Sequence, residues 1–188
     1  MIEQLKNIDI GLLLKINGLH TEWLDFIMFQ ASERFTWIPF YILIVALLIK
    51  HYKKDSILIV FFAIITITLS DQISVHLFKE LVQRLRPCHN TEIQNSLHLV
   101  NNSCGGTYGF VSSHAANSFS ILVFLTPQIK DKIKYLWWAM LFWALLLCYS
   151  RIYLGVHYPT DVLAGAIVGS LVGIAIYQAM QLLMKNKL

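Results

Sequence analysis

Long runs of apolar residues are the feature that most limits what this chain can fold into. Residues 56–78 and 162–184 are each long enough to cross the hydrocarbon core of a bilayer as a helix, which takes about 17–25 residues. Three shorter runs lie at residues 35–49, 113–129 and 135–149, and the first and last of these need flanking residues to complete a crossing. The pattern predicts an all-α, polytopic transmembrane helical bundle of five to six spans.

The N-terminal segment, residues 1–34, is apolar but interrupted by charge. The charged residues that break its apolar stretches are Lys6, Asp9, Lys15, Glu22 and Asp25. The segment lacks the basic start, unbroken apolar core and small-residue cleavage site of a signal peptide. We expect a helix lying in the membrane interface, with a sixth span as the alternative. In either case residues 1–188 are expected to form a single integral membrane domain.

The formal net charge of +4 is compatible with a nucleic-acid partner, but the positions of the lysines indicate membrane topology instead. They gather in two predicted loops and at the C-terminus: Lys50, Lys53 and Lys54; Lys130, Lys132 and Lys134; Lys185 and Lys187. The predicted spans place all three groups on one side of the membrane, and the positive-inside rule makes that side cytoplasmic. We therefore expect no nucleic-acid partner, and expect residues 86–112 and the turn around His157 to face outward.

Three polar stretches interrupt the apolar chain. They read KELVQRLRP at 79–87, VSSH at 111–114 and SRIYLGVHYPTD at 150–161. Polar groups placed at membrane depth are costly and usually functional. Together they supply cations, serines, histidines and a carboxylate, a combination that is typical of a site that handles phosphate.

In the first stretch, Lys79 and Arg86 are seven residues apart, nearly two helical turns. On a continuing helix that Pro87 ends, both point to the same side. Two such cations suit a phosphate, which arginine can bind with two hydrogen bonds. The alternative is a pair of cations extending to the membrane edge. Arg84 does not lie on the helix face that carries Lys79 and Arg86, and we assign it to the protein surface.

The second stretch leads from a loop into a helix expected to begin near Ala115. Free backbone N–H groups at a helix start bind anions, and Ser112 and Ser113 can add hydroxyl donors. A serine that simply caps the helix is a compatible alternative. His114 is placed to act as a general acid.

In the third stretch, Arg151 ends one span and Pro159 suits the first position of the next helix. From the first turn of that helix, the carboxylate of Asp161 can reach back to a ring nitrogen of His157, fix its tautomer and leave the other nitrogen exposed. A histidine held in this way is a competent nucleophile towards phosphorus. The alternative is that Asp161 only favours the helix dipole.

The order KxxxxxxRP, PSGH, SRxxxxxHxxxD is the signature of the type-2 phosphatidic acid phosphatase family, membrane lipid phosphatases related to vanadium haloperoxidases. The chain resembles this family over residues 79–161. The first and third motifs are complete, whereas Val111 replaces proline and Ser113 replaces glycine in the middle motif.

The resemblance implies a role for each matching residue and requires no cofactor and no metal. His157 would attack phosphorus and form a phosphohistidine, Asp161 would orient it, and His114 would protonate the leaving oxygen. The phosphoryl oxygens would be held by Lys79, Arg86, Ser112, Arg151 and the backbone N–H of Ser113.

The resemblance also implies a lipid phosphate or diphosphate as substrate and a site facing the periplasm from a bacterial inner membrane. Small size favours undecaprenyl diphosphate, with lipid A second and phosphatidylglycerophosphate or phosphatidate also possible substrates. The alternatives are a vanadate-dependent haloperoxidase and a non-enzymatic transporter or lipid-binding scaffold. Asp71, within the second span, would fit an ion or proton path in a transporter. Otherwise it pairs with a cation inside the bundle, or lies where water enters the membrane.

Cys88 and Cys104 both lie in the expected outward loop, where an oxidising compartment permits a disulfide. Closing such a loop is worth roughly 3 kcal/mol. The alternatives are two free thiols, or a zinc site with His89 and His98, which lacks the usual paired-ligand spacing.

The last span carries a repeated small-residue pattern, with glycines at every fourth position: Gly165, Gly169 and Gly173. Small residues at this spacing let another helix approach closely. We therefore expect this face of the span to pack against a neighbouring helix.

Overall fold

The computed structural model describes residues 2–185, and over that range it is helical, with one isolated β-bridge and no strand. The α-helices are α1 (Ile2–Asn17), α2 (Glu22–Ser32), α3 (Ile38–Tyr52), α4 (Ser56–Gln72), α5 (Glu80–Val82), α6 (Ser113–Ile129), α7 (Lys134–Tyr153) and α8 (Pro159–Lys185). A π-helical turn, Ile73–Lys79, continues α4 into α5. The all-α class is confirmed.

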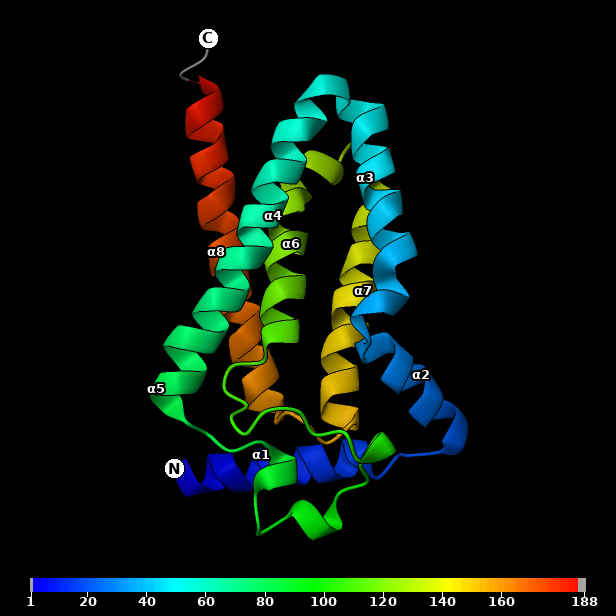
Figure 1. Ribbon diagram of the computed structural model, residues 1–188, viewed down its shortest axis with the longest axis vertical. Helices are drawn as coiled ribbons and strands as arrows, with labels where there is room; N and C mark the ends of the chain where they lie inside the picture. Colours follow the sequence, from blue (N-terminus) through cyan, green and yellow to red (C-terminus); the bar gives the residue numbers. More distant parts are fainter. Residues whose placement is uncertain (1, 186–188) are drawn as a thin grey trace.

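The five long helices α3, α4, α6, α7 and α8 run along the long axis of the molecule, and α1 lies across one end of them (Figure 1). Three segments are long and apolar enough to cross a membrane: Arg34–Val82, Lys134–Tyr153 and Pro159–Lys185. The first folds back on itself at Lys53–Asp55, so that α3 and α4 run in opposite directions. Large apolar side chains also cover the outside, as expected for a surface in contact with lipid; Ile57 is 74% exposed.

Helix α6 forms the centre of the bundle and packs most closely against α8. A Cβ at Gly169 would lie 2.0 Å from the carbonyl oxygen of Ala116, and one at Gly165 would lie 2.5 Å from that of Ser112. Gly173 approaches the carbonyl oxygen of Ser120 in the same way. Only residues without a side chain allow this approach, so the predicted packing role of the three glycines is confirmed.

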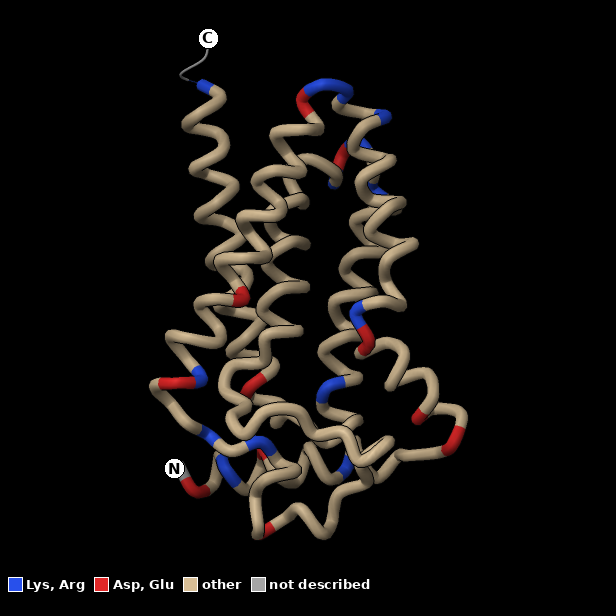
Figure 2. The backbone as a smooth tube through the Cα atoms, viewed as in Figure 1, with Lys and Arg blue, Asp and Glu red and all other residues tan. Residues whose placement is uncertain are grey.

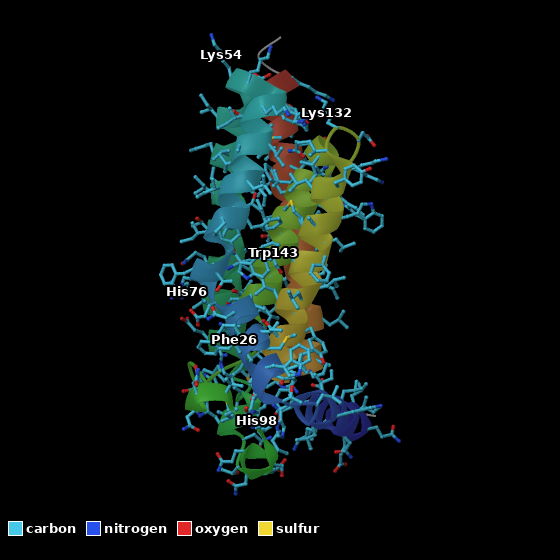
Figure 3. All side chains as sticks on the ribbon, turned by 90° about the vertical axis from the view of Figure 1, so that its right-hand side faces the viewer. Phe26, Lys54, His76, His98, Lys132 and Trp143 are labelled. Atoms are coloured by element: carbon cyan, nitrogen blue, oxygen red, sulfur yellow. A yellow bond between two sulfur atoms is a disulfide. The ribbon has the colours of Figure 1, made fainter. Side chains whose placement is uncertain are left out.

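The lysine-rich turns lie at one end of the bundle. Lys and Arg gather at the α3–α4 turn and at the end of α8 (Figure 2). Lys54 and Lys132 lie at this same end, whereas His98, in the long loop, lies at the other (Figure 3). Lys187 is outside the described residues. The lysines of the predicted loops therefore lie at one end, although Lys and Arg are also present at the other (Figure 2), and the side of the membrane that each end faces stays a prediction.

The helix expected to carry Lys79 and Arg86 together is interrupted, and that prediction is wrong. Helix α5 ends at Val82, and Gln83 takes a left-handed backbone with φ 50°. The chain then runs extended over residues 84–86 and pairs with residues 107–109: the Arg86 N–H donates to the Thr107 carbonyl at 3.0 Å. This pairing supplies the backbone partners that a longer helix would have supplied.

Candidate functional site

The three polar stretches meet at the end of the bundle away from the lysine-rich turns. The Ser112 N–H donates to the Asp161 carbonyl at 3.0 Å, which joins the second stretch to the third. The Lys79 ammonium donates to Ser113 Oγ at 2.9 Å, which joins the first to the second. All the residues singled out in the motifs therefore belong to one region, although α5 ends before Arg86.

His157 lies in the turn between α7 and α8 and is 1% exposed. Its Nε2 is 3.3 Å from Arg86 Nη1, and its Nδ1 is 3.6 Å from Asp161 Oδ2. The second distance is too long for a hydrogen bond, so the direct bond expected between His157 and Asp161 is not formed here. Asp161 Oδ2 instead accepts from the Tyr158 N–H at 3.0 Å, because a carboxylate at the third position of α8 reaches back to the residue that caps the helix.

Gly109 allows the loop backbone to lie against this pair. A Cβ at this position would sit 3.1 Å from Asp161 Oδ2 and 3.5 Å from His157 Nδ1. Any side chain here would therefore press on both groups. Our motif analysis assigned Gly109 no role at the site, and its position just before the middle motif is the only signal for it in the sequence.

The surroundings of His157 keep its ring neutral. Burial lowers the pKa of this imidazole well below its ordinary value of 6.5, and the nearby cations Arg86, Arg151 and Lys79 lower it further. Both effects disfavour the charged form. A neutral ring has a lone pair to offer, as a nucleophile requires.

Arg84 belongs to this site, so its assignment to the surface is wrong. Its Nη1 donates to Asp161 Oδ1 at 2.7 Å, and its Nη2 donates to Asp9 Oδ2 at 2.7 Å. Its guanidinium also lies 3.9 Å from the ring centroid of Tyr158. The helical wheel that placed Arg84 on another face does not apply, because the helix has already ended at Val82.

Asp9 connects the N-terminal helix α1 to the same network. It is 3% exposed and accepts from the Thr160 N–H at 3.0 Å and from Thr160 Oγ1 at 2.5 Å. The only sequence signal for it was a single carboxylate in an apolar stretch. Its partners lie far along the chain, at Arg84 and Thr160, and spacing cannot identify them.

Arg86 is held by the long loop of residues 83–112. Its Nε donates to the Tyr108 carbonyl at 3.3 Å and its Nη1 to the Cys104 carbonyl at 3.4 Å. Cys88 and Cys104 form a disulfide that closes this loop beside the arginine. Their sulfurs are bonded to each other, so the zinc site considered for them is not formed.

The PAP2 superfamily model matches residues 35–185, which is most of the chain. The chain belongs to the PAP2 superfamily. The family prediction is thereby confirmed, and with it the predictions of an integral membrane protein and of a hydrolase that acts on phosphate esters.

Two relatives and one solved structure describe its place in the PAP2 superfamily. The lipid A 4'-phosphatase of Bacteroides thetaiotaomicron is 38% identical over 182 residues, which cover 94% of this chain and 79% of that protein. The undecaprenyl-diphosphatase of Sulfolobus acidocaldarius is 28% identical over 171 residues, covering 90% and 73%. The crystal structure of a transmembrane PAP2-type phosphatidylglycerolphosphate phosphatase from Bacillus subtilis matches with a TM-score of 0.70 at 20% identity, covering 95% of this chain and 87% of that one. The last similarity shows the shared fold.

Ser113, one of the two departures from the PAP2 pattern, points into the site. Its Oγ accepts from Lys79 and lies 2.8 Å from Ser74 Oγ, so the hydroxyl fixes the position of the ammonium group. Ser112 caps α6, its Oγ accepting from the Ala115 N–H at 3.5 Å. Ser112 thus takes the capping role considered for it, and the role of either hydroxyl as a donor to phosphate stays a prediction.

A cavity of about 560 Å³ opens beside the motifs. His114, Arg151 and Ser113 line its polar end, and apolar side chains of α3 and α7, such as Ile44 and Leu147, line the part that lies deeper in the bundle. Arg151 donates to Ser32 Oγ through Nη1, while its buried Nε has no partner among the described residues. The cavity therefore joins a cationic end to an apolar interior.

Asp71 also lines this cavity, and its partner is not the cation considered above. It accepts a hydrogen bond from Asn117 Nδ2 at 3.2 Å. A neutral amide takes the place of the expected cation because Asn117 lies on the neighbouring helix α6, whereas Lys79 turns towards Ser113.

Proposed function

We propose that this PAP2 protein is a lipid phosphatase that uses His157 as its nucleophile. The observation that carries the assignment to a lipid is the cavity, which places Arg151 and His114 next to an apolar interior. A phosphorylated lipid has the same division, with a charged head and apolar chains. A soluble phosphate ester would make no use of the apolar part.

The proposed reaction proceeds in two steps. His157 Nε2 attacks phosphorus and forms an N–P bond while the P–O bond to the lipid breaks, and His114 gives its proton to the departing oxygen. Water then attacks the phosphohistidine, His114 takes a proton from that water, and inorganic phosphate leaves. The cations of Lys79, Arg86 and Arg151 stabilise the charge on the phosphoryl oxygens in both transition states.

We propose the 4'-phosphate of lipid A as the first substrate and undecaprenyl diphosphate as the second. This reverses the order favoured by chain size. The reason is the greater identity to the lipid A 4'-phosphatase, 38% against 28% for the undecaprenyl-diphosphatase. Both relatives are covered by this chain over more than two thirds of their length, so the comparison concerns the whole domain.

The proposed topology has five spans, α3, α4, α6, α7 and α8, with α1 lying in the interface. Residues 1–188 form one domain, and the site faces the periplasm from the inner membrane because the lysine-rich turns face the cytoplasm. A cysteine placed at Asn102 should be labelled by an impermeant thiol reagent on intact cells, and one placed at Lys54 should not. The reverse pattern would overturn the orientation.

The activity is tested with purified protein and a panel of lipid A, undecaprenyl diphosphate, phosphatidylglycerophosphate and phosphatidate, with phosphate release as the readout. We expect release to be fastest from lipid A and to be lost in His157→Ala. A His157→Ala protein with full activity would overturn the mechanism. Release from none of the four lipids would overturn the proposed function.

A further inference from the structure

The deeper wall of the cavity carries polar atoms that have no partner within the described chain. Trp143 is 5% exposed and lines the cavity, and its indole Nε1–H donates to nothing. Asn117 lines it as well, and its buried Oδ1 accepts from nothing. Unpaired buried donors and acceptors are rare in native proteins, because each costs free energy. Two of them on one cavity wall indicate a ligand that supplies the missing partners.

The indole is fixed in place and cannot turn to another partner. Trp37 packs against its ring edge-on with centroids 6.1 Å apart, and Phe40 and Tyr41 lie at 5.8 and 5.9 Å. These rings come from α3 and the turn before it, while Trp143 is on α7. Trp143 lies midway along the bundle, between the end marked by Lys132 and the end marked by His98 (Figure 3).

The amide of Asn117 is oriented by the neighbouring carboxylate. Its Nδ2 donates to Asp71 Oδ1, so its Oδ1 is left to accept from another group. Asp71 lines the same cavity and adds carboxylate oxygens. The wall thus offers one N–H donor, from Trp143, and two kinds of oxygen acceptor, from Asn117 and Asp71.

These groups lie within reach of a lipid whose phosphate occupies the cationic end. On α6, Asn117 is three residues beyond His114, about 4.5 Å along the helix. On α7, Trp143 is eight residues before Arg151, about 12 Å along the helix. The first groups that follow the phosphate in an acylated lipid fall in this interval: sugar or glycerol hydroxyls, and amide or ester linkages.

We propose that Trp143, Asn117 and Asp71 form a second subsite that binds an acyl amide, or a hydroxyl and ester pair, of the lipid substrate. The carbonyl oxygen accepts from the indole N–H, and the amide N–H or hydroxyl donates to Asn117 Oδ1 and Asp71. This inference rests on the proposed lipid phosphatase function and narrows its substrate class. In a polyprenyl diphosphate the reacting phosphate is followed by a second, anionic phosphate and then by hydrocarbon. Neither supplies an N–H or O–H donor to Asn117 and Asp71, so this lipid leaves the subsite unpaired and is disfavoured.

The direct test is Trp143→Phe, which removes the N–H and keeps an aromatic ring. We expect kcat/KM for lipid A to fall about tenfold, the value of one hydrogen bond of about 1.4 kcal/mol, and kcat/KM for undecaprenyl diphosphate to stay within about twofold. Asn117→Leu should give the same selective loss. The matched control is Trp138→Phe, on the same helix but 61% exposed, which should change neither substrate.

A binding measurement separates this inference from the proposed function. In a His157→Ala background, native mass spectrometry should find lipid A retained more strongly than undecaprenyl diphosphate, and Trp143→Phe should remove the difference. If Trp143→Phe lowers the retention of both lipids equally, or lowers neither, the proposed subsite is overturned. If the unmodified protein releases phosphate from none of the four lipids, the proposed function fails, and the binding comparison still decides the subsite.

Discussion

The two walls of the phosphate site are built in opposite ways. On one wall, His157 and Asp161 are 1% and 0% exposed, and Asp161 is bound by Arg84 and by the backbone of Tyr158. On the other wall, His114 and Arg151 line an open cavity, and one nitrogen of Arg151 has no partner in residues 2–185. We call these the closed wall and the open wall.

The difference indicates that the closed wall holds its residues in position before the lipid binds, and that the open wall binds the lipid. The closed wall is held by α1, α8 and the long loop of residues 83–112, so His157, the proposed nucleophile, has little freedom to move. The open wall leaves hydrogen-bonding groups for the ligand to satisfy. Changes to the closed wall should therefore reduce turnover, and changes to the open wall should alter which lipid is bound.

The largest effect is expected from Gly165→Ala, which adds a side chain at the contact of α8 with α6 next to the closed wall. The new Cβ would lie 2.5 Å from the Ser112 carbonyl oxygen, so Ser112 and Asp161 must move apart. We expect a loss of stability of about 1–3 kcal/mol and a fall in kcat of about a hundredfold. Gly11→Ala is the matched control, because nothing lies within 4 Å of its Cβ position. Equal behaviour of the two variants in thermal unfolding and turnover would contradict the packing argument.

Arg84→Gln should have the next largest effect, because it leaves Asp161 buried without its cation. Arg84 is a positioning residue, so we expect kcat to fall at least about tenfold with little change in KM, and Arg84→Lys to recover part of the loss. Lys6→Ala breaks a second ion pair of α1, with Glu92, that is exposed to solvent, and should change nothing measurable. A change in KM alone after Arg84→Gln would place this residue on the open wall instead.

Removal of the Cys88–Cys104 disulfide should have a moderate effect. The loop it closes holds Arg86 through two carbonyl groups, so Cys88→Ser with Cys104→Ser should lower kcat several-fold and stability by about 3 kcal/mol. Reductant should have the same effect on the unmodified protein and none on the double variant. Unchanged unfolding temperature in both tests would show that the loop holds Arg86 without the bridge.

The smallest effect is expected from pH. The folded protein keeps His157 neutral, while the unfolded chain binds a proton at about pH 6.5. The contribution of His157 to stability is therefore fully present above about pH 6.5 and is lost as the pH falls below it. Between pH 7.5 and 5.5 the unfolding temperature should fall by a few degrees more in the unmodified protein than in His157→Gln. An equal fall in both would contradict the lowered pKa.

The sequence predicted the helical class, the family and the meeting of the three motifs in one region, because motif order and apolar runs are local features; the roles of the motif residues stay predictions. Pro159 does begin α8, and the glycines of α8 do face α6. The roles of Arg84 and Asp9 escaped prediction, since both depend on where a helix stops and on contacts between distant segments. The hydrogen bond expected between Asp161 and His157 is not formed for a different reason: the carboxylate accepts from the Tyr158 N–H at the start of its own helix.

The most direct test of the account is to identify the residue that carries the phosphoryl group during turnover. Protein mixed with a ³²P-labelled lipid phosphate is quenched in alkali, digested and analysed by mass spectrometry. We predict phosphate on His157, formed and lost at rates that match turnover, and none in His157→Ala. Phosphate on another residue, or full turnover with no labelled His157, would contradict the assignment of the closed wall as the reacting one.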